Sequence, residues 1–246
     1  MQHCGVGQEG KINDTVQHMR PINLPQVELI EAYDLWAESY APAAHNPLMR
    51  AEEKAMLALM PDVRQKAALD LGCGTGRYSN ILMNRGAPNT VALDLSAEML
   101  RRAIAEMRVR ASMTELPFRD GAFDVIVSGL AVGHVENLTG WMHEAARTLK
   151  PDGVLLYSDF HPRAAQAGMK RSFHLADGRS CDLPHVVHEI PAHHDAANDA
   201  GLSIDAVSEL RVGIEFDERF EGSDRFFERW HGLPLVLVVR ARKVAV

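Results

Sequence analysis

The stretch AALDLGCGTGRYSN, residues 67–80, restricts the possible folds of this chain more than any other segment. An apolar run is followed by three closely spaced glycines, Gly72, Gly74 and Gly76, and then by a helical pattern from about Arg77. A strand, a glycine turn and a helix in this order place bare backbone N–H groups at the polar end of a nucleotide-like ligand. Glycine is required there because a side chain would block the ligand's approach or forbid the backbone dihedrals. The alternative is that the three glycines only shape a structural turn.

The spacing of the glycines separates this loop from two common nucleotide-binding motifs. A nicotinamide-type G-x-G-x-x-G fingerprint would have its third glycine where the chain has Arg77, and the G-K-S/T of a P-loop is absent. The next apolar run ends in Asp94, where a carboxylate can accept hydrogen bonds from both hydroxyls of a ribose. Ser96 follows as the expected N-cap of a helix. The loop therefore disfavours a nicotinamide-dependent dehydrogenase and remains compatible with another ribose-bearing ligand.

Short apolar runs alternate with helical segments along the central part of the chain. Strands that are buried on both faces read as unbroken apolar runs, and their alternation with helices predicts a parallel sheet covered on both sides. This pattern is a doubly wound α/β domain. The expected strands cover residues 67–71, 90–95, 123–130, 153–160, 202–214 and 234–243. The expected helices cover residues 26–38, 47–60, 77–86, 96–107, 138–150 and 192–201.

Length, composition and charge predict one cytoplasmic domain. Of the 246 residues, 46% are hydrophobic and 24% are charged, as in an ordinary globular protein. No apolar run approaches the roughly 20 residues of a membrane helix, and the first residues lack the apolar core of a signal peptide. A formal net charge of -7 argues against binding to nucleic acid phosphates, so we interpret the cluster RRAIAEMRVR as a solvated helix face. We expect neither nucleic acid nor a membrane among the partners.

Four segments in a fixed order resemble one family. LDLGCGTGRYS, ALDLSAEML, MTELPFRDGAFDVIVS and LKPDGVLLYSDFHP are similar to the motifs of class I S-adenosylmethionine-dependent methyltransferases. Within that class they resemble the branch of ubiquinone/menaquinone C-methyltransferases and malonyl-carrier-protein O-methyltransferases. The resemblance implies a seven-stranded, mostly parallel sheet of order 3-2-1-4-5-7-6 with strand 7 antiparallel and helices on both faces. It also implies S-adenosyl-L-methionine as the cofactor and S-adenosyl-L-homocysteine as its product.

The resemblance also implies a cofactor-binding role for the positions that match the family's motifs. Asp70 and the glycine loop would lie against the methionine half, Asp94 would bind the ribose diol, and Leu95 would flank the adenine. Family members commonly carry an Asp before LPF, but this chain has Ser112, so the adenine contact would come from the backbone of Met113. The expected cofactor-binding residues are Tyr33, Asp70, Gly72, Gly74, Gly76, Asp94, Leu95, Ser112, Met113, Ser128 and Leu130.

Residues just after the fourth and fifth strands are candidates for contacts with the methyl acceptor, because ligands of open α/β sheets lie beyond the carboxyl ends of the strands. Methyl transfer from a sulfonium is an in-line displacement, and a base is needed only when the acceptor must lose a proton. We predict His161 and Asp159 as candidates for that base, followed by His134, for which the alternative is that it braces the adjoining helix. The predicted substrate residues are Tyr40, Arg163, His193 and His194.

The domain organisation follows from where regular patterning begins and ends. We expect residues 1–24 to form a mobile tail and residues 25–246 a single methyltransferase domain, with residues 25–60 as a helical lid and 160–195 as a substrate-side insertion. Six of the twelve histidines lie in that insertion, but the absence of an H-E-x-x-H pair makes a metal site the minor alternative. Its four cations either attract an acidic acceptor or lie on the surface: Arg163, Lys170, Arg171 and Arg179.

The sequence thus predicts a cytoplasmic S-adenosylmethionine-dependent methyltransferase that acts on a small-molecule metabolite by O-, N- or C-methylation. The first alternative is O-methylation of a malonyl-type acyl carrier protein thioester. The net charge of -7 disfavours that alternative, because a carrier protein is acidic and prefers a basic surface. The second alternative is a non-catalytic module that binds the cofactor. We expect a monomer or a homodimer.

Overall fold

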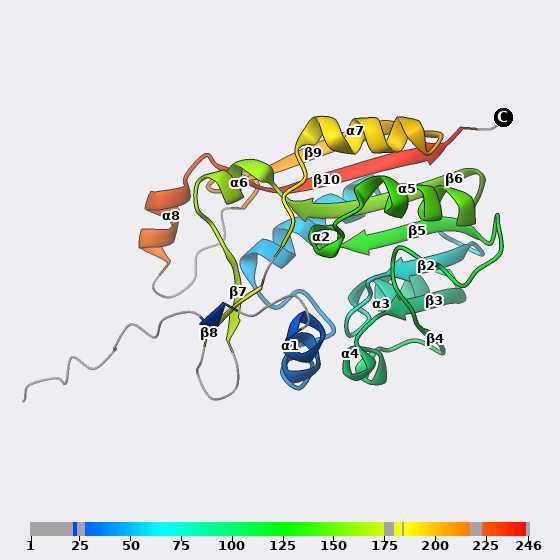
Figure 1. Ribbon diagram of the computed structural model, residues 1–246, viewed down its shortest axis with the longest axis horizontal. Helices are drawn as coiled ribbons and strands as arrows, with labels where there is room; N and C mark the ends of the chain where they lie inside the picture. The colour runs from blue at the N-terminus through cyan, green and yellow to red at the C-terminus, as the bar shows by residue number, and fades with distance from the viewer. Residues whose placement is uncertain (1–21, 24–27, 175–179, 184, 217–222, 245–246) are drawn as a thin grey trace, which may run out of the picture.

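A seven-stranded sheet forms the centre of the molecule (Figure 1). The computed structural model describes residues 22–23, 28–174, 180–183, 185–216 and 223–244. From one edge to the other the strands are β4 (Met107–Arg110), β3 (Asn89–Asp94), β2 (Ala67–Leu71), β5 (Phe123–Gly129), β6 (Leu149–Phe160), β10 (Pro234–Lys243) and β9 (Leu202–Arg211). β10 runs antiparallel to β6 and β9, whereas the other neighbouring pairs are parallel. Numbered in chain order within this sheet, the strands follow the order 3-2-1-4-5-7-6, so the predicted topology is confirmed.

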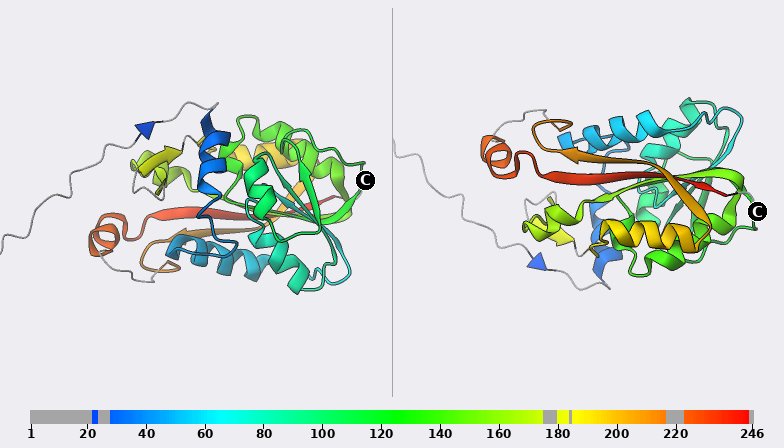
Figure 2. Two further views of the ribbon diagram at one scale, coloured as in Figure 1. Left: turned by 90° about the horizontal axis from the view of Figure 1, so that it is seen from below. Right: turned by 90° about the horizontal axis from the view of Figure 1, so that it is seen from above.

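Helices cover both faces of this sheet (Figure 2). α5 (Leu138–Thr148) and α7 (Ile190–Asp199) pack on one face, and α2 (Pro47–Leu59) and α3 (Arg77–Asn84) pack on the other. The remaining helical elements are α1 (Glu28–Trp36), α4 (Ala97–Arg102), the 3-10 helix η1 (Val132–His134), α6 (Pro162–Gln166) and α8 (Asp224–Trp230). Because η1 and α6 follow β5 and β6 directly, they lie at the carboxyl edge of the parallel strands.

Each face of the sheet has its own hydrophobic core. Trp141 of α5 and Tyr157 of β6 are buried in one core, whereas Met56 of α2 and Leu82 of α3 are buried in the other. β10 is buried along most of its length, in agreement with its unbroken apolar sequence. Ser96 accepts the backbone N–H of Met99 at 3.1 Å and so caps α4 as predicted. These contacts hold the carboxyl edge of the sheet, where the candidate site lies.

The cluster RRAIAEMRVR does not form one solvated helix. α4 ends at Arg102, and the chain from Met107 forms the edge strand β4, so the prediction of a helix over residues 96–107 is wrong in its second half. Ala103, with extended backbone, closes the helix by donating its N–H to the carbonyl of Leu100. β4 pairs only with β3 within the described chain, and most of its side chains are exposed. An edge strand of this kind tolerates charged residues and lacks the apolar run by which inner strands are recognised.

Two strands of a second, three-stranded sheet lie within the predicted insertion. β7 (Arg171–His174) pairs antiparallel with β8 (Ser180–Leu183), which pairs parallel with β1 (Ile22–Asn23). Neither this sheet nor α8 is predicted from the sequence. Apart from β1, the predicted tail over residues 1–24 lies outside the described residues, and so does Arg179. None of the helices in the described ranges is long and apolar enough to cross a membrane.

Candidate functional site

The glycine loop between β2 and α3 is built to pack closely against its neighbours. Gly72, Gly74 and Gly76 have positive φ values of 75°, 53° and 86°, which a side chain would disfavour. A Cβ atom at Gly72 would lie 2.7 Å from the Cβ of Ala131 and 2.8 Å from the Sδ of Met113. Glycine therefore lets the loop approach the segments that follow β4 and β5, and these three segments enclose one end of a cavity.

The amide groups of this loop are not bare. The N–H groups of Gly72 and Cys73 donate to the carbonyl of Leu93 at 2.8 and 2.9 Å. The N–H of Gly74 donates to Oδ2 of Asp94 at 2.8 Å. The prediction that the loop presents free N–H donors is therefore wrong at these three positions, because the end of β3 already accepts them. The loop contributes shape and space to the site, and it positions Asp94.

Two carboxylates flank the loop, of which Asp70 is buried and Asp94 is half-buried. Asp94 accepts the N–H of Ser96 through Oδ1 at 2.9 Å as well as that of Gly74 through Oδ2, and burial raises its pKa. Asp70 accepts both the N–H and the hydroxyl of Ser79 at 2.7 Å, and burial raises the pKa of Asp70 to about 6. Asp70 therefore fixes the first turn of α3 against β2, whereas Asp94 has hydrogen-bonding capacity left for a ligand, since each carboxylate oxygen can accept more than one hydrogen bond.

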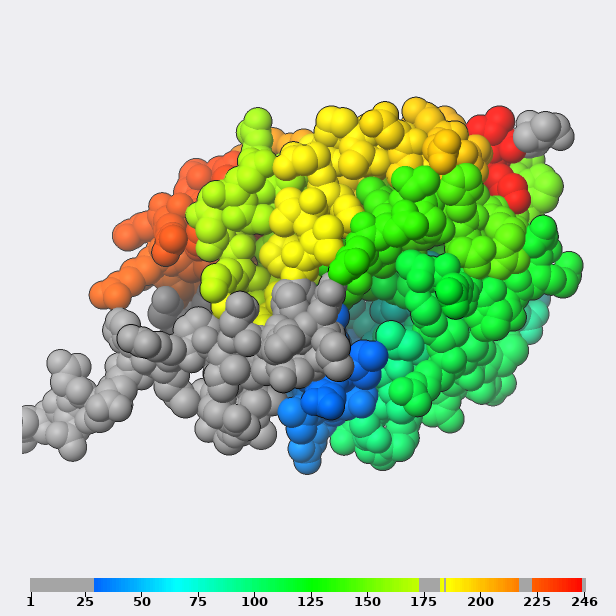
Figure 3. Space-filling view, viewed as in Figure 1, coloured from blue at the N-terminus to red at the C-terminus, as the bar shows by residue number. Residues whose placement is uncertain are grey.

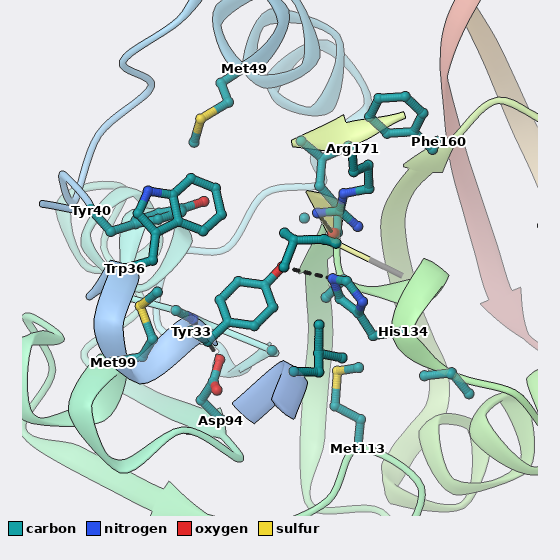
Figure 4. A pocket seen from close by; sticks show the side chains of 18 of the residues that line it. Tyr33, Trp36, Tyr40, Met49, Asp94, Met99, Met113, His134, Phe160 and Arg171 are labelled. Atoms are coloured by element: carbon teal, nitrogen blue, oxygen red, sulfur yellow. Dashed lines mark hydrogen bonds between the residues drawn. The ribbon is translucent and has the colours of Figure 1, made fainter. Parts of the chain in front are cut away.

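A cavity of about 1270 Å³ extends from the glycine loop to the insertion and α8. Figure 3 shows the surface hollowed beside α1, which is drawn in blue, and Figure 4 shows the interior. The wall includes eleven of the predicted site residues: Tyr33, Tyr40, Asp70, Gly72, Gly74, Asp94, Leu95, Ser112, Met113, Leu130 and His134. It does not include seven others, namely Gly76, Ser128, Asp159, His161, Arg163, His193 and His194. A typical site for one small ligand has about 300–1,000 Å³, so this cavity has room for two reactants.

Tyr33 and His134 join opposite walls of the cavity. The hydroxyl of Tyr33, on α1, lies 2.7 Å from Nε2 of His134, on η1 (Figure 4). Their rings meet edge to face with centroids 5.4 Å apart. Burial raises the pKa of Tyr33 to about 12, so its hydroxyl keeps its proton at neutral pH. The pair places one exchangeable proton and one basic nitrogen at the middle of the cavity.

Leu130 follows β5 in a left-handed conformation, with φ of 56°. Its N–H donates to the hydroxyl of Ser158 at 2.9 Å, which holds this unfavourable backbone in place. The side chain of Leu130 lines the cavity. The hydroxyl of Ser128, two residues earlier, donates to the carbonyl of Leu71 at 2.7 Å and is fully buried, so it holds β5 against β2.

Asp159 and His161 lie on either side of Phe160, which lines the cavity. Successive side chains of a strand point in opposite directions, and these two do not line it. Asp159 is 1% exposed and accepts the N–H of Phe160 at 2.7 Å. Nδ1 of His161 accepts the N–H of Arg163 at 3.1 Å and so caps α6. Nε2 of His161 lies 3.7 Å from Glu209, and burial lowers the pKa of this histidine.

The remaining predicted substrate residues also lie away from the cavity. His193 packs on Tyr157, with Nδ1 3.0 Å from the tyrosine hydroxyl, and burial lowers its pKa to about 4. His194 is exposed on α7. Arg163 lines a separate open depression of about 430 Å³. Within the ranges that the structure describes, no group of three or more His, Cys, Asp or Glu side chains is arranged to hold a metal ion.

Several residues of the cavity wall were not predicted from the sequence as site residues. Arg77, at the position of a missing third glycine, forms a buried ion pair with Glu52 of α2 at 2.8 Å. Its side chain therefore lies in the wall and links α2 to α3. The larger apolar and aromatic residues among the other unpredicted wall residues are Trp36, Met49, Tyr78, Met99, Phe160, Met169, Leu183, Phe216, Phe226 and Trp230. Tyr78, Met99 and Phe160 belong to segments that the sequence analysis singled out, but their side chains were not predicted to line a site.

Residues 69–157 match the family model described as a methyltransferase domain. The sheet order, the glycine loop and this match define the class of the protein. Residues 69–157 thus form a methyltransferase domain of the class I S-adenosylmethionine-dependent type. The resemblance stated from the four sequence motifs is thereby confirmed.

Individual relatives resemble parts of the chain. It is 37% identical over 118 residues to a malonyl-[acyl-carrier protein] O-methyltransferase of Enterobacter lignolyticus, covering 46% of this chain and 47% of the relative. It is 35% identical over 112 residues to a demethylmenaquinone methyltransferase of Tropheryma whipplei, covering 43% and 46%. The crystal structure of an S-adenosylmethionine-dependent methyltransferase from Mesorhizobium loti aligns with a TM-score of 0.63 and 25% identity, covering 78% of this chain and 97% of that one. The chain spans about half the length of the curated relatives it matches.

The cavity fits the cofactor of this class. Beside Gly74 the loop borders open space, since the nearest side-chain atoms to an added Cβ, from Met99 and Tyr40, would lie 4.0 Å away. The carboxylate of Asp94 faces that space with capacity to accept two hydroxyl groups. Next to it, Leu95 and Met113 supply apolar surface for a flat ring. An acceptor for hydroxyl groups and an apolar surface for a ring thus line the same end of the cavity, as a bound nucleoside requires.

Proposed function

We propose that the protein transfers a methyl group from S-adenosylmethionine to a small-molecule acceptor. The observation that carries this proposal is that one cavity connects the glycine loop and Asp94 with a second half that is mainly apolar and aromatic. Two reactants can therefore meet in one cavity. The coarser conclusion, a class I methyltransferase, comes from the family match, and the small acceptor is supported by the apolar and aromatic second half.

The half of the cavity beside the glycine loop binds the cofactor. Asp94 accepts the ribose hydroxyls, Leu95 and Met113 enclose the adenine, and the loop from Gly72 to Gly74 borders the methionine half. Ser112 offers one hydroxyl oxygen in place of the two oxygens of an Asp, and that oxygen already accepts the N–H of Thr114 at 3.2 Å and is hydrogen-bonded to the hydroxyl of Thr114 at 2.8 Å. Residues 25–60, with α1 and Tyr33, act as the lid over this half.

The chain accelerates the reaction chiefly by position. The bound cofactor supplies an electrophilic methyl group, and holding an acceptor atom in line with it supplies much of the rate enhancement. When the acceptor is a phenol or a carbon acid, His134 takes the proton at Nε2, either directly or through the hydroxyl of Tyr33. We therefore transfer the proposed base from His161 and Asp159, which do not line the cavity, to His134, which does.

The test is transfer of labelled methyl from S-adenosylmethionine into an extract separated into small molecules and carrier proteins. We expect label among the small molecules. Asp94→Ala should weaken cofactor binding by more than about tenfold, or about 1.4 kcal/mol, and reduce the label accordingly. Glu106→Ala is the matched control, because Glu106 is an exposed acid that does not line the cavity. An unchanged cofactor dissociation constant in Asp94→Ala would contradict the ribose assignment.

A carrier-bound acceptor is the second candidate, and one surface feature favours it. The open depression beside α8 is lined by Arg163, Arg211, Arg229 and His231, and Arg229 also lines the main cavity. A basic depression beside the cavity suits an anionic partner, such as the partner named for the Enterobacter relative. Label on carrier protein would support this candidate. Cofactor binding without label in either fraction would favour the non-catalytic module.

A further inference from the structure

Arg171 is the first residue of β7, and its side chain reaches into the cavity (Figure 4). Nη2 of the guanidinium donates to the carbonyl of Leu130 at 2.9 Å. The guanidinium carbon lies 5.7 Å from the centre of the Phe160 ring. These two contacts hold the charge at the end of β5, near the Tyr33–His134 pair.

The hydrogen-bonding capacity of Arg171 is incomplete within the described part of the chain. Its second terminal nitrogen, Nη1, is buried and has no hydrogen-bond partner there. Two other cations of the cavity wall differ, since Arg77 is paired with Glu52 at 2.8 Å and Lys170 with Asp182 at 2.8 Å. A buried guanidinium with unpaired N–H groups is unfavourable unless a ligand completes it. Arg171 is therefore suited to receive an anion from the cavity.

The nearby acid supplies only part of the negative charge that Arg171 lacks. Asp159 is buried and forms no hydrogen bond to Arg171 among the described residues. Burial raises its pKa to about 7, although the charge of Arg171 lowers it, so much of this acid keeps its proton at neutral pH. Oδ2 of Asp159 and Nε2 of His185 are also buried without hydrogen-bond partners among the described residues. The ring of His185 lies 5.8 Å from that of Phe160. Three polar side chains with a buried atom that lacks a hydrogen-bond partner among the described residues therefore surround the Phe160 ring. Of these three, Arg171 lines the cavity.

The position of Arg171 favours an acceptor over the cofactor as its ligand. Arg171 belongs to the insertion and lies among apolar wall residues such as Phe160, Met169 and Leu183. Beside the glycine loop, the nearby polar side chain is Tyr40 rather than Arg171. The ring of Tyr40 would lie 4.0 Å from a Cβ atom built at Gly74. The anion site thus adjoins the apolar half of the cavity.

We propose that the acceptor is a small acid with an apolar or aromatic body, and that Arg171 selects it by binding its carboxylate. This inference rests on the proposed function and specifies its substrate class. The carboxylate completes the hydrogen bonding of Nη1, while the body of the acceptor packs on the aromatic wall. Arg171 thereby orients the acceptor relative to the Tyr33–His134 pair.

The test uses two matched probes, 4-hydroxybenzoate and its neutral counterpart 4-hydroxybenzamide, titrated by calorimetry into the full chain loaded with S-adenosylhomocysteine. The variants are Arg171→Gln, Arg171→Lys and the control Arg102→Gln, which removes an exposed arginine outside the cavity. We expect the wild type to bind the carboxylate at least about tenfold more tightly than the amide. Arg171→Gln should abolish that preference, Arg171→Lys should restore part of it, and Arg102→Gln should leave it unchanged.

Two controls separate the possible failures. Melting temperatures establish that each variant folds, and the affinity for S-adenosylhomocysteine is measured for each. Equal binding of both probes by the wild type overturns the inference while leaving the proposed function intact. The inference is also overturned if Arg171→Gln loses as much affinity for S-adenosylhomocysteine as for the carboxylate probe, because the guanidinium would then hold the cofactor's own carboxylate. A wild type that does not bind S-adenosylhomocysteine overturns the proposed function, and this inference with it.

Discussion

At the scale of single residues, Asp159 makes stability depend on pH. Burial raises its pKa from 3.8 to about 7 in the folded protein. The folded state therefore retains a proton that the unfolded chain loses, so the contribution of Asp159 to stability is complete below about pH 4 and is lost as the pH rises through about 7. Asp159→Asn preserves an acceptor for the N–H of Phe160 and removes the titration. The unfolding free energy of the wild type should fall relative to that of this variant by on the order of 2 kcal/mol when the pH is raised from about 5 to about 8.

Urea unfolding of both proteins at the two pH values measures this difference. A parallel pH dependence of the two proteins would mean that Asp159 titrates near its ordinary value. The neutral acid would then not explain why Arg171 lacks a counter-ion.

Two histidines near the carboxyl edge are expected to respond differently to substitution. His134→Gln removes the basic Nε2 that faces Tyr33, and we expect turnover to fall by on the order of a hundredfold if the acceptor must lose a proton. His161→Asn replaces one capping side chain by another and should retain turnover, because His161 does not line the cavity. Labelled transfer at saturating cofactor compares the two. A larger loss in His161→Asn would return the base to the position first predicted from the sequence.

At the scale of elements, the ion pair of Glu52 and Arg77 joins α2 to α3. Glu52 is fully buried, and its Oε1 also accepts the hydroxyls of Tyr78 at 2.8 Å and Ser158 at 2.6 Å. Glu52→Gln leaves the buried charge of Arg77 with only the more distant Glu53, at 3.4 Å, as a counter-ion, which should cost up to about 3–5 kcal/mol of unfolding free energy. The double variant Glu52→Gln/Arg77→Met removes both charges. Its loss of unfolding free energy should therefore be smaller than the sum of the losses in the two single variants. Urea unfolding of all four proteins gives the coupling, and strict additivity would contradict it.

Helix α1 is attached to α4 through one carboxylate. Asp34 accepts the hydroxyl of Ser96 and, at 3.3 Å, the N–H of Glu98. We expect Asp34→Ala to increase both the association and the dissociation rates of S-adenosylhomocysteine, because α1 forms part of the cavity wall and would open more often. Stopped-flow fluorescence of Trp36 measures both rates. Glu31→Ala, an exposed substitution on the same helix, should leave them unchanged, and equal effects of the two substitutions would contradict the lid role.

The elements that the sequence predicted well are those with strong local signals. The strand at residues 67–71 coincides with β2, since buried parallel strands have continuous apolar runs. β4, β7 and β8 were missed because edge and hairpin strands carry polar residues and obtain their stability from pairing. The residues expected to bind the cofactor came from the family resemblance, and most of them line the cavity because they follow the ends of neighbouring strands; their binding role stays a prediction. Phe160 and its neighbours show the limit: the pattern located β6, but which side chains face the cavity depends on the packing of α6 and η1.

At the scale of the whole molecule, ligand binding should stabilise the fold as one unit. S-adenosylhomocysteine at a hundred times its dissociation constant adds about 2.7 kcal/mol to the unfolding free energy, which raises the melting temperature of a chain of this size by about 5–10 °C. Asp94→Ala at the same concentration should show roughly half of that shift, because a tenfold loss of affinity removes about 1.4 kcal/mol. NADH should produce no shift, since Arg77 and its ion pair with Glu52 occupy the place of the third glycine. Equal shifts with both nucleotides would mean that the loop recognises only their shared adenosine.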